Sequence, residues 1–236
     1  MICVVPLAGP DFERADGGLK PLIAVEGQPL LRRALESRRW WRSGDLRSEG
    51  LVFVLRDSEA GRAFARVHLS AWYPGARILF LSAYTGGAAL SALAGVALTA
   101  HEDRPVCVDL ADILFDDETG AAALFAGDAR AGGLGLWFEH DSPLYSYFEL
   151  DEAGLVRRVR EKQVISRCAS AGVYLFRAPQ VYIAAVAHSL AHRETLAHKD
   201  LMFVAPTLNG VVEAGWDVHA ARVDRVVDLK IEVGLS

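Results

Sequence analysis

The first residues that could do chemistry lie in the loop at 9–20. An apolar run at 2–8 leads to Gly9, and the loop ends at Lys20, which is followed by a proline. Glycine lets a backbone approach an anion closely, and backbone amides can hold phosphate oxygens. The lysine ammonium would add a mobile positive charge. We interpret the stretch as a phosphate-binding loop, with an ordinary solvated loop as the alternative. It matches neither the dinucleotide-binding glycine fingerprint nor the P-loop.

Carboxylates follow two later apolar runs. Asp109 and Asp112 end one of them, and Asp228 follows another near the C-terminus. A carboxylate at the end of a buried strand is costly unless it is paired or binds a cation. Because Mg²⁺ takes one or two carboxylates together with substrate phosphates, we predict Mg²⁺ binding at Asp112 and Asp228. The alternatives are a helix cap and a surface turn, and we interpret Asp116 and Asp117 as solvated turn residues.

Two further segments could contact ligands. Gly86 and Gly87 precede an alanine-rich helical stretch, where small residues permit a flat ring or a phosphate to approach the helix start. A helix start capped by Thr85 explains the same residues equally well. Glu161 could accept sugar hydroxyls and Lys162 could pair with a phosphate, although an exposed ion pair is the commoner meaning of such a dipeptide.

These side chains require a scaffold that brings them together. Apolar runs alternate with stretches of helical period; the runs lie at 2–8, 51–55, 77–81 and 106–110, and the helical stretches at 28–40, 58–69 and 87–100. Such alternation predicts a mostly parallel, Rossmann-like α/β sheet with helices on both faces. Ligands bind outside the carboxyl ends of the strands in such sheets, which is where the lysine and the carboxylates stand.

After residue 112 the pattern changes to short strands. We expect a small antiparallel insertion and then further α/β elements: strands at 133–139, 145–150, 155–160, 171–176 and 217–223, and helices at about 179–192 and 199–214. A short tail follows the last strand. Because no repeat or linker is visible, we predict a single domain over 1–236 with a β-rich elaboration at about 133–176.

Composition excludes several classes of function. The chain has 236 residues, 52% hydrophobic and 23% charged, with a net charge of −5, which argues against nucleic acid as a partner. No apolar run approaches the roughly 18 residues of a membrane span. The three cysteines are far apart and form no disulfide or zinc spacing, so a cytoplasmic location is the default. Aromatic residues in the 133–176 segment leave a homo-oligomer contact open, with core packing as the simpler interpretation.

The order of these segments resembles the GT-A-like nucleotidyltransferases, the sugar-1-phosphate nucleotidylyltransferase superfamily. That family begins with a strand, an A-G loop and K-P-L-(I/L)-x-V-x-G-x-P, and residues 20–31 read KPLIAVEGQPLL. Its G-(Q/A)-A segment is similar to residues 85–89, and its metal aspartate looks like Asp112. Its E-K-P and downstream G-(I/V)-Y-(L/V)-F motifs resemble Glu161-Lys162 and residues 172–176.

The resemblance implies an enzyme in which a phosphate monoester, such as a sugar 1-phosphate, attacks the α-phosphate of an NTP and releases pyrophosphate, with Mg²⁺ as cofactor. It also implies roles for individual residues. Those roles are catalysis by Lys20 and Arg14, nucleotide binding by Leu7, Ala8, Gly9, Gly86 and Gly87, acceptor binding by Glu161, Lys162 and Gly172, and metal binding by Asp112 and Asp228.

One departure bears on catalysis. The family's loop reads A-G-x-G-(S/T)-R, whereas residues 8–14 read AGPDFER. The second glycine of the motif is missing, and two acidic residues, Asp11 and Glu13, stand in a loop that would bind a polyanion. Arg14 lies one position further along the chain than the family arginine, so it takes that place only after a local shift of the loop. A degenerate relative that binds ligands without transfer is therefore an alternative. A GT-A glycosyltransferase is a further one, although its D-x-D motif is not matched.

Overall fold

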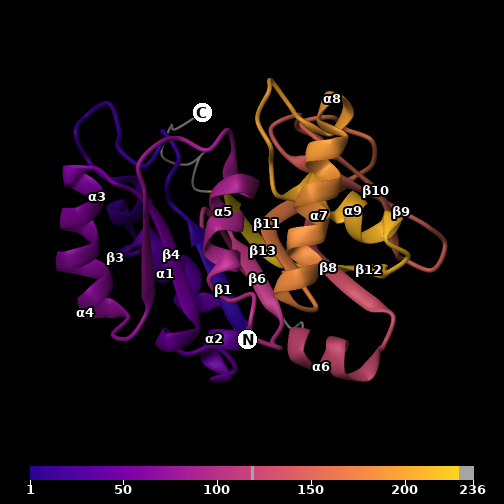
Figure 1. Ribbon diagram of the computed structural model, residues 1–236, viewed down its shortest axis with the longest axis horizontal. Coiled ribbons are helices and arrows are strands. Elements are labelled where there is room, and N and C mark those ends of the chain that lie inside the picture. Colours follow the sequence, from indigo (N-terminus) through magenta and orange to yellow (C-terminus); the bar gives the residue numbers. More distant parts are fainter. Residues whose placement is uncertain (118–119, 229–236) are drawn as a thin grey trace.

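The computed structural model describes residues 1–117 and 120–228, except for the side chains of 121 and 122. A nine-stranded sheet forms the centre of the protein (Figure 1). Its strands are β1 (Ile2–Pro6), β4 (Leu51–Arg56), β5 (Arg77–Leu81), β6 (Val106–Asp109), β8 (Ala131–Glu139), β9 (Ser146–Leu150), β10 (Val156–Glu161), β11 (Cys168–Phe176) and β12 (Asp217–Arg222).

The sheet has a parallel half and a mostly antiparallel half. The main order is β10-β9-β11-β6-β1-β4-β5, and β8 joins β11 to β12. Strand β1 is parallel to β4 and β6, and β4 is parallel to β5. Strand β11 is antiparallel to β6, so the predicted antiparallel insertion is continuous with the parallel sheet.

Helices cover both faces, as predicted. They are α1 (Leu30–Ser37), α2 (Arg39–Arg42), α3 (Glu59–Phe64), α4 (Ser70–Trp72), α5 (Ala88–Ala97), α6 (Ala121–Gly127), α7 (Pro179–Ala191), α8 (Arg193–Leu196) and α9 (Leu208–Glu213). A π-helical segment, Ala65–Leu69, joins α3 to α4, and 3-10 turns lie at Lys20–Leu22, Ser48–Gly50 and Ala205–Thr207. Within the described ranges, every helix is too short or too polar to cross a lipid bilayer.

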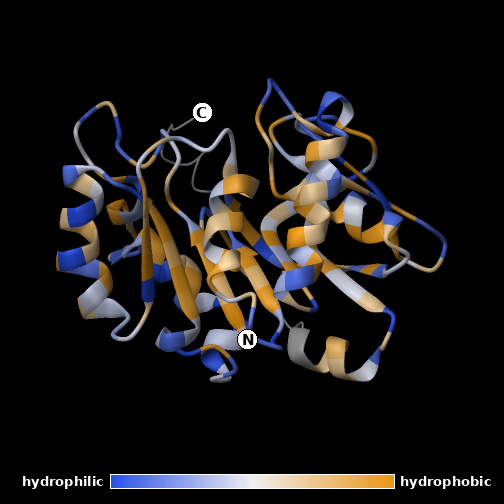
Figure 2. Cartoon of the chain, in the orientation of Figure 1, coloured by the Kyte–Doolittle hydropathy of each residue, from blue (hydrophilic) through white to orange (hydrophobic). Residues whose placement is uncertain are grey.

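Alternation of side chains along the strands divides the interior into two cores. In β1, Cys3 and Val5 pack on the side of α1 and α3, whereas Ile2 and Val4 pack on the side of α5, α7 and α9. Figure 2 shows the result: hydrophobic colour is concentrated along the central strands and on the helices α5 and α7, while hydrophilic colour lies mainly on α3 and on the loops. Continuous hydrophobicity in these strands therefore reflects burial on both faces.

The predicted helix at 199–214 is wrong over its first part. Helical structure there is confined to Ala205–Glu213, and the preceding residues form turns and a bridge. The reason lies in Met202, whose N–H donates to Gly86 (2.9 Å) and whose carbonyl accepts from Ala89 (3.0 Å). Because these groups pair across to the start of α5, they cannot join an intrahelical ladder.

The expected C-terminal tail contains another strand. β13 (Asp224–Asp228) pairs antiparallel with β7 (Ile113–Asp116), with Val227 opposite Leu114 and Asp228 opposite Ile113. β2 (Ala24–Val25) and β3 (Gln28–Pro29) form another two-stranded sheet. The β7–β13 pairing returns the end of the described chain to the carboxyl side of β6, where the predicted metal ligands lie.

Candidate active site

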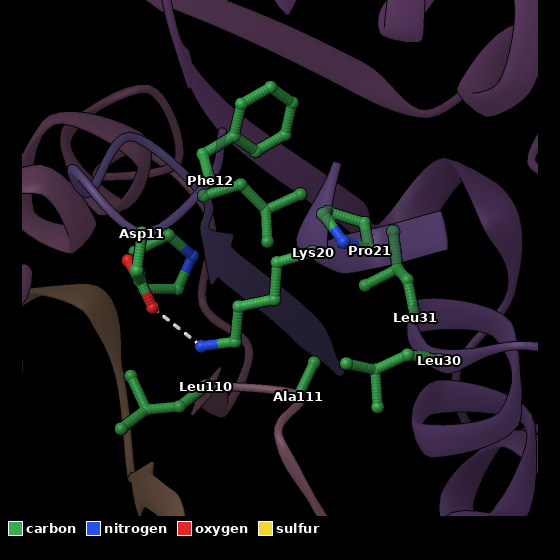
Figure 3. Close-up of a pocket in the computed structure, with 10 residues that line it drawn as sticks. Asp11, Phe12, Lys20, Pro21, Leu30, Leu31, Leu110 and Ala111 are labelled. Carbon is green, nitrogen blue, oxygen red and sulfur yellow. Dashed lines mark hydrogen bonds and ion pairs between the residues drawn. The ribbon is translucent and has the colours of Figure 1, made fainter. Parts of the chain in front are cut away.

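Lys20 lies in a small pocket at the carboxyl end of β1. Its side chain is 15% exposed, and its ammonium nitrogen is 2.6 Å from Oδ2 of Asp11 and 3.6 Å from Oδ2 of Asp112. Figure 3 shows the lysine pointing between Asp11 and the apolar side chains of Leu110 and Ala111. An apolar surround lowers the local dielectric, which strengthens the attraction of the ammonium for anions.

The loop interior differs from an open phosphate cradle. Phe12 is only 4% exposed and belongs to the main core, so this position anchors the loop. Pro10 has no N–H, and the Phe12 N–H donates to the Gly9 carbonyl at 3.2 Å, so neither position offers an amide to a phosphate. Asp11, with 65% of its side chain exposed, places its carboxylate on Lys20 where a phosphate would otherwise bind.

The other charged loop residues face different partners. Glu13 accepts a hydrogen bond from the Ser58 hydroxyl at 3.2 Å. Arg14 pairs with Asp16 at 2.8 Å, within the same loop. The structure therefore turns Glu13 away from Lys20 but turns Asp11 toward it. The role predicted for Arg14 on the phosphates has no support from its contacts and stays a prediction.

Asp112 follows a turn that a buried ion pair holds in place. The Arg38 guanidinium donates to both carboxylate oxygens of Asp109, at 2.8 and 3.1 Å, and to the Ile113 carbonyl at 3.1 Å. Asp109 Oδ1 also accepts from the Ala111 N–H at 2.8 Å. Asp109 is thus a structural residue, and the turn that it braces directs the 6% exposed carboxylate of Asp112 toward Lys20. Because Asp109 is paired with Arg38, it is not available as the second metal-binding aspartate that the glycosyltransferase alternative needs, which weakens that alternative.

Asp228 lies beside Asp112 because of the β7–β13 pairing. It stands opposite Ile113, the residue that follows Asp112. The Tyr145 hydroxyl donates a 2.6 Å hydrogen bond to Oδ2 of Asp228. Burial raises the pKa of Tyr145 above its usual range, assisted by the hydrogen bond to Asp228 and by the charges of Asp228 and Asp112, so the phenol keeps its proton. The residues after Asp228 lie outside the described part of the chain.

Two carboxylates suit a magnesium ion that takes its remaining ligands from substrate phosphates. Among the described residues there is no group of three or more histidine, cysteine, aspartate or glutamate side chains that could hold a metal without such help. The donor set of Asp112 and Asp228 therefore fits a metal that binds together with a phosphate ligand.

The interpretation of Asp116 and Asp117 as solvated turn residues is wrong for Asp117, and for Asp116 it is right about solvent, since 43% of that side chain is exposed, but wrong about the turn. Asp116 ends β7 and forms an ion pair with Arg225, and Asp117 is only 2% exposed. The chain continues as a strand at this point because β13 pairs with it, so Asp117 is carried into the interior.

The segment at 86–87 is shaped by its neighbour in space. Gly87 has φ 134°, and a Cβ there would collide with the Met202 carbonyl. The Thr85 hydroxyl bonds to the Gly87 carbonyl (3.1 Å) and to Ser91 (2.7 Å), so it does not cap α5 as the alternative required. Helix α5 packs on β1 and β4, which brings its start to the same sheet edge as the loop after β1.

Two of the three predicted acceptor residues, Gly172 and Glu161, lie close to Asp112 or to Tyr174. Gly172 has φ 75°, and a Cβ there would lie 3.5 Å from Oδ1 of Asp112. Glu161 is buried and accepts a hydrogen bond from the Ser146 hydroxyl. Burial, with smaller contributions from the charges of Glu161 and Asp112, raises the pKa of Tyr174. Gly172 therefore adjoins the metal candidate Asp112 directly, and the charges of Glu161 and Asp112 both act on Tyr174, a residue that the sequence interpretation missed.

Lys162 is positioned by its backbone. It has φ 53°, its N–H donates to the Tyr145 carbonyl at 3.0 Å, and its ammonium lies 5.6 Å from the centre of the Phe203 ring. A separate hollow of about 440 Å³ is lined by residues 138–140, Tyr145 and residues 222–228. None of the predicted acceptor residues, Glu161, Lys162 and Gly172, is among the residues that line this hollow next to Asp228.

No protein-family model matches this chain, and no curated protein sequence matches it significantly. Solved structures do share its fold. A nucleoside-diphosphate-sugar pyrophosphorylase from Vibrio cholerae RC9 superposes with a TM-score of 0.79 at 19% identity, covering 97% of this chain and 95% of that one.

Two further solved structures resemble the chain. A Bacillus anthracis protein provisionally described as a glucose-1-phosphate thymidylyltransferase, in complex with sucrose, gives a TM-score of 0.75 at 15% identity, covering 99% of this chain and 92% of that one. A UDP-glucose pyrophosphorylase in complex with UDP-glucose gives 0.68 at 15% identity, covering 97% and 94%. The fold is therefore that of the sugar-1-phosphate nucleotidylyltransferases.

Proposed function

We propose that this chain is a nucleotidylyltransferase that joins an NTP to a sugar 1-phosphate or a similar small phosphate monoester. The observation that carries the proposal is the convergence of Lys20, Asp112 and Asp228 at one edge of a nucleotidylyltransferase-like sheet. Lys20 faces the Asp112 carboxylate, and Asp228 stands opposite the residue that follows Asp112. Such an arrangement suits a reaction whose catalysis is mostly positioning and charge neutralisation.

In the proposed reaction an oxygen of the acceptor phosphate forms a bond to the α-phosphorus of the NTP. The bond from that phosphorus to the bridging oxygen breaks, and pyrophosphate leaves with the electron pair. Lys20 stabilises the negative charge that accumulates on the phosphoryl oxygens. Asp112 and Asp228 would hold Mg²⁺, which when bound supplies further neutralisation of the phosphates. Glu161 would accept hydrogen bonds from hydroxyl groups of the second substrate, because a carboxylate at neutral pH can accept hydrogen bonds but cannot donate them.

Pyrophosphate release tests the proposal. The protein is incubated with Mg²⁺, each common NTP in turn and a panel of sugar 1-phosphates and other small phosphate monoesters. We expect release with at least one pair and no release when the acceptor is omitted. Complete inertness together with no Mg²⁺-dependent binding of any NTP would overturn the proposal.

A binding protein without transferase activity is the second candidate, and the contact between Asp11 and Lys20 favours it. The aspartate neutralises Lys20, the lysine among the described residues that line the pocket, and Pro10 removes an amide from the loop. Nucleotide binding measured by thermal shift, with no pyrophosphate released from any pair, would support this candidate over the enzyme.

We expect Asp11→Asn to bind NTP about three- to tenfold more tightly than the wild type, because it removes a negative charge that competes for Lys20. Isothermal titration with Mg²⁺ and the preferred NTP measures the change. Glu13→Gln is the matched control, since it also neutralises a loop acid but one that contacts Ser58. Weaker binding by Asp11→Asn would show that the carboxylate assists the nucleotide instead of competing with it.

A further inference from the structure

Tyr145 connects the main sheet to the strand that carries Asp228. It directly precedes β9, and its hydroxyl donates to Oδ2 of Asp228 at 2.6 Å. The residue is 7% exposed, so water competes little for this hydrogen bond. A charge-assisted hydrogen bond from a phenol to a carboxylate is stronger than one between neutral groups.

Its ring and its backbone are both held in place. The ring meets Phe138 edge-to-face at 5.1 Å between centroids and His140 at 4.9 Å. The Tyr145 carbonyl accepts the Lys162 N–H at 3.0 Å. The hydroxyl is therefore presented from a fixed position, which is what an orienting partner requires.

Strand β13 is held by its pairing with β7, by the ion pair of Arg225 with Asp116 and by apolar contacts of Val226 and Val227. It belongs to a two-stranded sheet, and its register with β7 shifts between Asp224 and Val227. The pairing and the core contacts fix the backbone position of Asp228, whereas the orientation of its carboxylate depends on side-chain contacts such as the hydrogen bond from Tyr145.

We propose that Tyr145 is a positioning residue: it restrains the Asp228 carboxylate beside Asp112 and thereby sets the affinity of the pair for a divalent cation. This inference rests on the proposed function, because that function assigns metal binding to the two aspartates. Side chains that orient metal ligands typically contribute 10- to 100-fold to metal affinity or activity.

The test is the affinity of the full chain for Mn²⁺ in the presence of a fixed concentration of inorganic phosphate, which supplies ligands that the two carboxylates lack, read from the electron paramagnetic resonance signal of the free ion. We expect Tyr145→Phe to bind Mn²⁺ about 10- to 100-fold more weakly than the wild type. Tyr147→Phe is the matched control: it removes the same hydroxyl two residues away, where that group donates to the Ser142 carbonyl at 2.6 Å. Its Mn²⁺ affinity should equal that of the wild type.

The Asp228→Asn variant shows how much of the measured Mn²⁺ binding belongs to this site. Adding Tyr145→Phe to that variant should weaken Mn²⁺ binding no further. Melting temperatures without metal separate a general loss of stability from a loss of affinity. A Tyr145→Phe variant that binds Mn²⁺ as the wild type does, whatever its melting temperature, overturns the inference and leaves the proposed function standing. If the Asp228→Asn variant binds Mn²⁺ with the same affinity as the wild type, both the metal assignment and the inference are overturned.

Discussion

Replacing Lys20 with alanine is expected to lower the rate of nucleotidyl transfer by about 100- to 1,000-fold, the range found when one preorganised charge-stabilising donor is removed. The ammonium lies in the pocket between Asp11 and Asp112 and is mostly shielded from water. Without it, negative charge building up on the phosphoryl oxygens would lie near the carboxylates of Asp11 and Asp112, with no ammonium from Lys20 to offset them. An arginine is a poor substitute here, because its planar fork differs in shape from a compact ammonium.

Single-turnover pyrophosphate release with saturating NTP and acceptor isolates the chemical step. Lys199→Ala is the control, since it removes an exposed lysine of the same chain. The melting temperature of Lys20→Ala must accompany the rate, because the substitution also removes a partner of the nearly buried Asp112. A folded Lys20→Ala protein that transfers nucleotide at the wild-type rate would contradict the assignment of this lysine.

Replacing Arg38 with alanine is expected to destabilise the fold by about 3–5 kcal/mol. The guanidinium and the Asp109 carboxylate are both fully buried, and Arg38 also stacks 4.0 Å from the centre of the Phe115 ring. Removing one member leaves an uncompensated charge in the interior, where desolvation is costly. The turn that presents Asp112 would lose its brace, so activity should fall together with stability.

Urea unfolding followed by circular dichroism measures this loss. Arg130→Ala is the matched control, because Arg130 makes a similar two-pronged contact with Asp217, at 2.9 and 3.4 Å, on the surface. Its unfolding midpoint should stay close to that of the wild type. Arg38→Met combined with Asp109→Leu should recover much of the stability, since it removes both charges. If Arg38→Ala and the wild type unfolded at the same urea concentration, the Arg38–Asp109 ion pair would not stabilise the fold.

Much of the fold follows from local pattern. Strands β1, β4, β5 and β6 lie where the apolar runs predicted them; β1, β4 and β6 are buried on both faces and so must be hydrophobic throughout, whereas β5, at the end of the main strand order, is only partly buried. The helices that follow them show the expected alternation. The prediction failed at 199–204 and at 113–116, where backbone pairing with distant segments overrode local preference. Single-domain organisation, the cytoplasmic location, magnesium dependence and a homo-oligomer remain predictions.

The sequence by itself determined which residue types reach the carboxyl edge of the sheet: Lys20 after the first strand and Asp112 after the strand at the centre. Only the tertiary structure decided how their charges are paired. Arg38 meets Asp109 across 71 positions, and Tyr145 meets Asp228 across 83. Such contacts depend on strand order and on the β7–β13 register, which local hydrophobic period does not encode. Even the contact of Asp11 with Lys20, nine positions apart, required the fold, because it depends on Phe12 being buried and turning the loop inward.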